Sequence, residues 1–122
     1  MTNKTALLVY SLAILAIFVM AYLSMLPLHL ITVRWFDSLG HFVLYGLWGY
    51  FFGKAYPRLV IDKAVFTVSV GIAICTAIAI LEECLQYLSP YRSFTLSDMA
   101  LSLLGILTAA GYLNYIRNKK FT

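Results

Sequence analysis

The stretch ALLVYSLAILAIFVMAYLSML, residues 6–26, carries no charged side chain along its whole length. A helix needs about 20 consecutive apolar residues to cross a bilayer, so this stretch is long enough to span one. Its apolar run is too long for a signal peptide, and we expect it to remain in the protein. The sequence therefore predicts a membrane-spanning helix here.

The rest of the chain has the same apolar character. Hydrophobic residues make up 62% of the sequence and charged residues 11%, whereas soluble domains have roughly 25% charged residues. Three further apolar segments, at residues 39–56, 64–81 and 99–116, each have about the minimum length for a spanning helix. The first of the three is the weakest, because His41 and Lys54 lie near its ends. We predict a single domain with four transmembrane helices.

The lysines and arginines indicate how these helices are oriented. Seven of the nine lie in the N-terminal tail, in the loop after the second segment or in the C-terminal tail. The positive-inside rule places such regions in the cytoplasm, and this pattern requires an even number of spans. The prediction is an all-α bundle of four transmembrane helices with both termini in the cytoplasm. Its basic face would meet anionic lipid, and no sequence motif indicates a nucleic-acid partner.

The acidic residues gather on the opposite, outer side of the predicted bundle. Asp37, Glu82, Glu83 and Asp98 all fall there, whereas Asp62 is expected in the cytoplasm. Charged residues at or within a membrane usually mark a functional site, because they are costly to place there. The sequence therefore predicts a polar site at the outer ends of the helices, and it places these charges toward the helix ends.

One side of the predicted site lies on the second segment. Asp37, His41 and Tyr45 are spaced four apart, so on a helix they share one face. Asp37 can serve as the N-cap of that helix beside an interfacial histidine. Alternatively, its carboxylate orients an imidazole that works as an acid, a base or a ligand. The spacing alone leaves both interpretations open.

Two further groups complete the site. Glu83 and Gln86 are three apart and share a helix face, whereas Glu82 lies about 100° away and is expected to reach for lipid headgroups. Asp98 begins the fourth segment, as an N-cap or as a side chain that faces the bundle. In the preceding loop, Arg92 can pair with a carboxylate or bind an anion, and Ser93 offers a hydroxyl.

The second segment also contains a glycine motif. Gly49 and Gly53 form a G-x-x-x-G pair, with Gly46 nearby. Small residues at this spacing let two membrane helices approach closely. The motif predicts close packing either within the bundle or in a homodimer.

These motifs together resemble the VanZ-like family of small bacterial membrane proteins. The resemblance covers roughly residues 10–115 and agrees in order and spacing. It rests on D-x-x-x-H with a following tyrosine, on E-x-x-Q, and on R-S-x-x-x-x-D with a following glycine: Asp37, His41, Tyr45, Glu83, Gln86, Arg92, Ser93, Asp98 and Gly105. The chain departs from the family at Ser38 and Ser102, where a lysine and an asparagine are common, so it lacks that lysine charge and that amide. The resemblance favours Glu83 over Glu82.

The resemblance implies a place in the bacterial cell envelope. The family's namesake is associated with low-level resistance to the glycopeptide antibiotic teicoplanin, and an inner-membrane protein whose polar site faces outward fits such a role. An enzyme acting on a lipid-linked or cell-wall-related substrate would use Asp37, His41, Glu83 and Asp98 as catalytic groups. Its substrate would be bound by Tyr45, Gln86, Arg92 and Ser93.

Three alternatives remain beside this enzyme. In one variant, the four catalytic groups hold a divalent metal such as zinc or manganese, although no dense ligand motif is present. A noncatalytic protein could use the same pocket to capture a cell-wall precursor or a glycopeptide. A small transporter would need an ionisable residue near the membrane centre, which the sequence does not predict.

Overall fold

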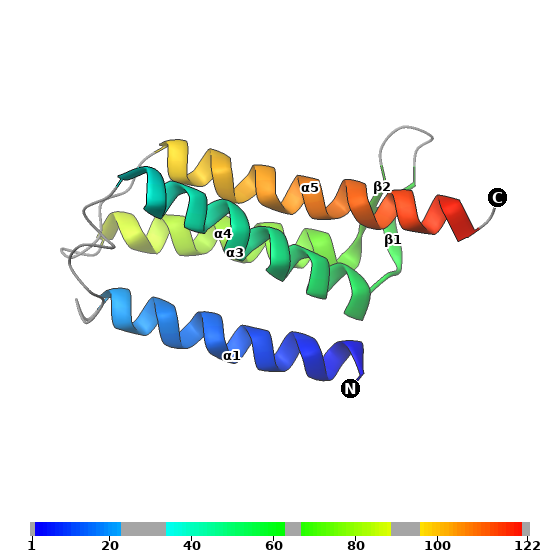
Figure 1. Ribbon diagram of the computed structural model, residues 1–122, viewed down its shortest axis with the longest axis horizontal. Coiled ribbons are helices and arrows are strands. Elements are labelled where there is room, and N and C mark those ends of the chain that lie inside the picture. Colours follow the sequence, from blue (N-terminus) through cyan, green and yellow to red (C-terminus); the bar gives the residue numbers. More distant parts are fainter. Residues whose placement is uncertain (1, 23–33, 63–66, 89–95, 121–122) are drawn as a thin grey trace.

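The computed structural model describes residues 2–22, 34–62, 67–88 and 96–120. Within them the chain forms four helices and one small β-hairpin (Figure 1). In chain order these elements are α1 (Asn3–Tyr22), α3 (Arg34–Ala55), β1 (Leu59–Asp62), β2 (Thr67–Ser69), α4 (Val70–Leu88) and α5 (Leu96–Lys120). The prediction of a helical protein is confirmed for this part of the chain, and the hairpin is an addition to it.

Three of the described helices are suited to a bilayer. By length and composition, α1, α4 and α5 can each cross a membrane, through Asn3–Met20, Val70–Leu88 and Leu96–Lys119. Such long helices satisfy their own backbone hydrogen bonds, which is the condition for spanning hydrocarbon. The chain therefore has the character of an integral membrane protein.

The helices run alternately up and down the long axis of the molecule (Figure 1). Both chain ends and the hairpin lie at one end, which we call the basic end because Lys4, Lys54, Arg58, Arg117 and Lys119 are found there. The N-terminal ends of α3 and α5 and the C-terminal end of α4 lie at the opposite end. In the interior, α3 packs against α1, α4 and α5.

The third predicted helix is displaced along the sequence. The prediction of a helix over residues 64–81 is wrong at both ends, because α4 begins at Val70 and ends at Leu88. Within the predicted segment, Thr67–Ser69 form β2 of the hairpin, in which Ile61 pairs with Val68 and Asp62 with Thr67. Ile61, Thr67 and Val68 are β-branched and favour strands, because their side chains are restricted in a helix. The other three helices start between three and five residues before the predicted segments.

Glycines allow α3 to lie very close to α4 and α5. A Cβ atom at Gly105 in α5 would overlap the carbonyl oxygen of Phe42, and one at Gly71 in α4 would overlap that of Phe52. Gly49 faces α5, where an added Cβ would lie 3.4 Å from the Cβ of Ala109. The small residues of α3 are therefore used for packing within the bundle, as in other membrane helix pairs.

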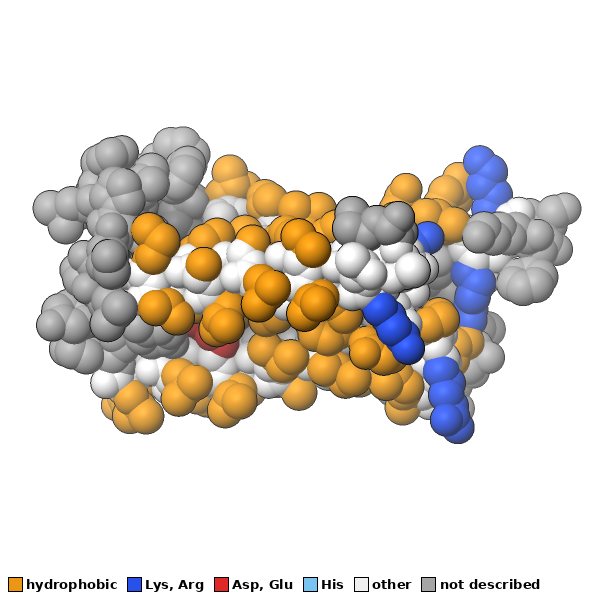
Figure 2. All heavy atoms as spheres, turned by 90° about the horizontal axis from the view of Figure 1, so that it is seen from below, with side chains coloured by type: hydrophobic (Ala, Val, Ile, Leu, Met, Phe, Trp, Pro, Cys, Tyr) orange, Lys and Arg blue, Asp and Glu red, His pale blue; other side chains and the backbone are white. Residues whose placement is uncertain are grey.

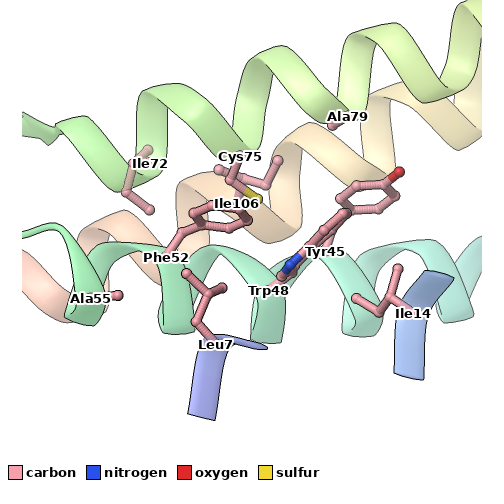
Figure 3. Packing of buried hydrophobic residues seen from close by; sticks show 10 residues of the cluster. All are labelled: Leu7, Ile14, Tyr45, Trp48, Phe52, Ala55, Ile72, Cys75, Ala79 and Ile106. Carbon is pink, nitrogen blue, oxygen red and sulfur yellow. The ribbon is translucent and has the colours of Figure 1, made fainter. Parts of the chain in front are cut away.

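Buried hydrophobic residues from all four helices meet around α3. Figure 3 shows this core, to which α1 contributes Leu7 and Ile14. Two hydrogen bonds also hold α1 on α3. The hydroxyl of Tyr10 donates to the carbonyl of Leu44 at 3.0 Å, and the Nε1 of Trp48 donates to the Oγ of Ser11 at 2.9 Å. In hydrocarbon, packing and such hydrogen bonds replace the hydrophobic effect as the force between helices.

The outer surface of the bundle is apolar along its length. Figure 2 shows hydrophobic side chains between the two ends and Lys and Arg side chains gathered at the basic end. Exposed leucines such as Leu8, Leu81 and Leu104 are at least half exposed, in agreement with contact with lipid. The polar side chains of interest lie inside this surface.

Candidate functional site

A group of seven polar or aromatic side chains is buried between α3, α4 and α5. Each has at most 7% of its surface exposed. We call this group the buried polar cluster, and its members are His41, Tyr45, Glu82, Glu83, Gln86, Asp98 and Ser102. Burying so many polar groups in an apolar bundle is costly unless they are paired or serve a purpose. The cluster lies toward the end of the bundle opposite the basic end.

The first half of the cluster is a close contact of three side chains. The Nδ1 atom of His41 lies 3.2 Å from the Oε1 atom of Glu83 and 3.1 Å from the Oγ atom of Ser102. The same Oγ lies 3.3 Å from Glu83 Oε1 and 3.0 Å from the backbone carbonyl of Asp98. A carboxylate on one ring nitrogen of a histidine fixes the tautomer and orientation of the ring. This geometry suits an imidazole that exchanges a proton through its other nitrogen.

The second half is formed by Tyr45, Glu82 and Gln86. The hydroxyl of Tyr45 donates to Glu82 Oε2 at 3.1 Å, and the Nε2 of Gln86 donates to Glu82 Oε1 at 2.6 Å. The ring of Tyr45 stacks on that of His41, with centroids 6.2 Å apart. The tyrosine thus joins the two halves, so both glutamates belong to one assembly.

The prediction for Glu82 is wrong. It does not reach for headgroups but is buried, and so is Glu83 beside it. The inward face of α4 also includes the adjacent pair Gly71 and Ile72, so this face is wide enough for neighbours in sequence. Such a face covers 100° or more, because α4 packs on two helices at once. Both glutamates also lie well inside α4, not at its end, since the helix continues to Leu88.

Two oxygen atoms of the cluster are buried without a hydrogen-bond partner in the described part of the chain. They are Glu83 Oε2 and Gln86 Oε1. Their side chains have 0% and 1% of their surfaces exposed. A buried acceptor left this way is unfavourable, and a ligand that brings a hydrogen-bond donor relieves the penalty. The cluster is therefore prepared to receive donor groups.

The remaining predicted site residues have different outcomes. Asp37 is not the N-cap of its helix, because α3 begins at Arg34; its side chain lies outside what the structure describes. Arg92 and Ser93 also lie outside the described residues. Asp98 lies in the first turn of α5, which begins three residues earlier than the predicted segment 99–116, and its side chain is buried. A carboxylate there is favoured by the positive end of the helix.

The structure adds Ser102 and Glu82 to the predicted residues. The sequence signal for Ser102 is its spacing of four from Asp98, which places both on one helix face. It stands where the VanZ-like pattern often has an asparagine, and its hydroxyl contacts His41 and Glu83. Among the described residues, no group of three or more His, Cys, Asp and Glu side chains is placed to hold a metal ion.

Comparisons with known proteins give no match. A scan against protein-family models, a search of curated proteins and a search of solved structures each found nothing similar to this chain. The resemblance to the VanZ-like family therefore stays a prediction that rests on the motifs. Five of the residues in these motifs, His41, Tyr45, Glu83, Gln86 and Asp98, are members of the buried polar cluster.

Proposed function

We propose that this chain is a VanZ-like protein of the bacterial inner membrane. In this proposal it crosses the bilayer four times, with both termini in the cytoplasm and the buried polar cluster toward the outer face. The gathering of Lys and Arg side chains around the two chain ends supports this orientation, because cytoplasmic regions are enriched in them. The cluster then lies within reach of the outer leaflet.

The proposed activity is catalysis on a lipid-linked or cell-wall-related substrate, linked to glycopeptide resistance. One observation carries it: His41 Nδ1 lies 3.2 Å from Glu83 Oε1 inside a buried site. In the proposal, Glu83 and Ser102 hold the imidazole, and Nε2 takes a proton from the attacking group of the substrate and returns it to the leaving group. General acid-base catalysis of this kind contributes 100-fold or more to a rate.

The chemistry of the cluster favours a substrate that carries hydroxyl or amide groups. Glu83 Oε2 and Gln86 Oε1 are buried acceptors, so donors on the substrate would be bound strongly. The apolar outer surface of the bundle favours a substrate that also has a lipid tail and arrives sideways from the bilayer. Lipid-linked sugars and peptides of the cell wall have both features.

The test uses purified protein in detergent with a panel of lipid-linked cell-wall precursors and teicoplanin. Products are identified by mass spectrometry, and binding is measured in parallel. We expect turnover by the wild type and a loss of at least 100-fold in His41→Ala. The matched control is His29→Ala, since His29 is the other histidine of the chain and lies outside the sequence motifs. Binding without turnover in the wild type would contradict the proposed enzyme and support a noncatalytic protein that captures a surface ligand.

A second candidate function is transport coupled to protons. It is favoured by the position of Glu82, which lies well inside α4 and accepts a hydrogen bond from Tyr45 in the middle of α3. An ionisable group inside a helix bundle is what such a transporter needs. In vesicles reconstituted with the protein, a pH gradient would then drive transport of the substrate across the membrane, and Glu82→Gln would abolish this transport. Equal movement by both proteins would refute this candidate.

A further inference from the structure

The basic end contains a cavity that the buried polar cluster does not touch. Its volume is about 240 Å³. Its walls come from α1, α3, α4, α5 and the hairpin. The polar residues that line it are Asn3, Lys54, Ser69, Asn114 and Arg117. A cavity at the end of membrane helices lies where lipid headgroups would meet the protein.

The two charged residues that line this cavity are both basic. Lys54 lies in the last turn of α3, and Arg117 lies near the end of α5. None of the described residues that line the cavity is acidic. Arg117 donates from Nη2 to Asn114 Oδ1 at 2.9 Å, a contact that uses one of the five N–H donors of its guanidinium group. The remaining donors suit the oxygens of a phosphate.

A helix end adds to this positive potential. Ser69 caps the N-terminus of α4, where its Oγ accepts a hydrogen bond from the backbone N–H of Ile72 at 3.2 Å. The N–H groups of Val70 and Gly71 are bonded to carbonyls of the preceding chain. The first amides are thus occupied, so α4 contributes through its dipole, which favours an anion near its N-terminus.

The remaining walls of the cavity are apolar. Ile72, Leu113 and Ile116 line it beside the polar residues. A free phosphate ion gains nothing from contact with apolar side chains, whereas the glycerol and first acyl carbons of a phospholipid are stabilised by it. The lining combines two cations and amides with aliphatic side chains. It therefore complements both the charged phosphate and the apolar glycerol and acyl part of a phospholipid.

We propose that this cavity binds the phosphate headgroup of an anionic phospholipid. Lys54 and Arg117 contact the phosphate oxygens, and the glycerol and upper acyl chain lie against Leu113 and Ile116. The bound lipid bridges α3, α5 and the hairpin at this end. The site goes beyond the proposed function and does not depend on it, because no member of the buried polar cluster lines the cavity.

The experiment compares two double variants that lose the same charge. Lys54→Gln with Arg117→Gln removes the two cations of the cavity. Lys4→Gln with Arg58→Gln removes two cations of the same end whose side chains do not line it. Native mass spectrometry of the full chain in neutral detergent measures the binding of short-chain phosphatidylglycerol. The loss of two basic groups that contact an anionic lipid is expected to raise the dissociation constant by about 30-fold.

We expect the cavity variant to bind phosphatidylglycerol about 30-fold more weakly and the control variant less than about threefold more weakly. An equal loss in both would show a general surface charge effect and overturn the site. Phosphatidylcholine and inorganic phosphate are tested on the wild type. Binding of inorganic phosphate as tight as that of the lipid would overturn the assignment to a headgroup. Lys54→Arg keeps the charge and should retain binding, which separates charge from misfolding.

Discussion

The two ends of the bundle use polar residues in opposite ways. Toward one end, His41, Glu82 and Glu83 are buried and bonded to other side chains. At the basic end, Lys4 and Arg58 are exposed. A buried polar contact depends on every partner, because a group that loses its partner stays away from water. An exposed cation keeps its water, so the two ends should respond very differently to substitution.

The largest effect is expected where the helices that hold the buried polar cluster touch. Gly105→Val would place a side chain against the carbonyl of Phe42 and force α5 away from α3. We expect the free energy of unfolding to fall by about 3 kcal/mol or more. Gly111→Val is the control, because nothing lies within 4 Å of an added Cβ there. Denaturation in detergent measures both, and equal stability of the two variants would contradict the close packing.

A smaller loss is expected from Glu83→Ala. This change leaves His41 and Ser102 buried without their shared carboxylate. The expected cost is about 2 kcal/mol in the free energy of unfolding, typical of a buried polar group that loses its partner. Glu83→Gln keeps an oxygen at the same position and should cost less. If the alanine variant were as stable as the wild type, the His41–Glu83 contact would not exist.

Tyr45→Phe should cost about 1 kcal/mol. The substitution keeps the ring and removes only the hydroxyl that donates to Glu82 Oε2. Hydrogen bonds between membrane helices are worth roughly 0.6 kcal/mol on average and up to about 1.7. Tyr112→Phe, at an exposed position of α5, is the matched control and should be neutral. The same unfolding assay compares the two, and an equal effect would argue against the hydrogen bond.

The smallest effect is expected at the basic end. Lys4 is exposed, and its Nζ lies 5.5 Å from the centre of the Tyr56 ring. Lys4→Gln should change the free energy of unfolding by less than about 1 kcal/mol, because exposed cation–π contacts are weak. A loss as large as that of Glu83→Ala would remove the contrast between the two ends.

Much of the fold follows from the sequence. An uncharged stretch such as residues 6–26 predicts the helix seen as α1, because a helix satisfies its backbone hydrogen bonds within a single segment in lipid. The hairpin was beyond this reasoning, since Val68 and its apolar neighbours fit a spanning segment as well as a strand. The predicted end of α4 was also wrong. Glu82 and Glu83 suggest a boundary with water unless their partners on other helices are known.

Only part of the buried polar cluster, and none of its contacts between helices, follows from the sequence. The spacings place His41 with Tyr45 and Glu83 with Gln86 on shared faces, and the structure buries all four. The contact between His41 and Glu83 joins two helices, and no spacing within one helix predicts it. The burial of Glu82 follows from the way α4 packs on two neighbours, which is likewise a property of the assembled bundle.

The light attachment of α1 has a consequence for how the chain enters a membrane. Of the window Asn3–Met20, 11% of the residues are buried, against 39% of Val70–Leu88. A helix like α1 is stable alone in lipid, since nearly all of its side chains are apolar. Helix α4 is not stable alone in the same way, because Glu82 and Glu83 would face hydrocarbon. Insertion of α4 should therefore be coupled to its meeting with α3 and α5, while α1 is free to join at any stage.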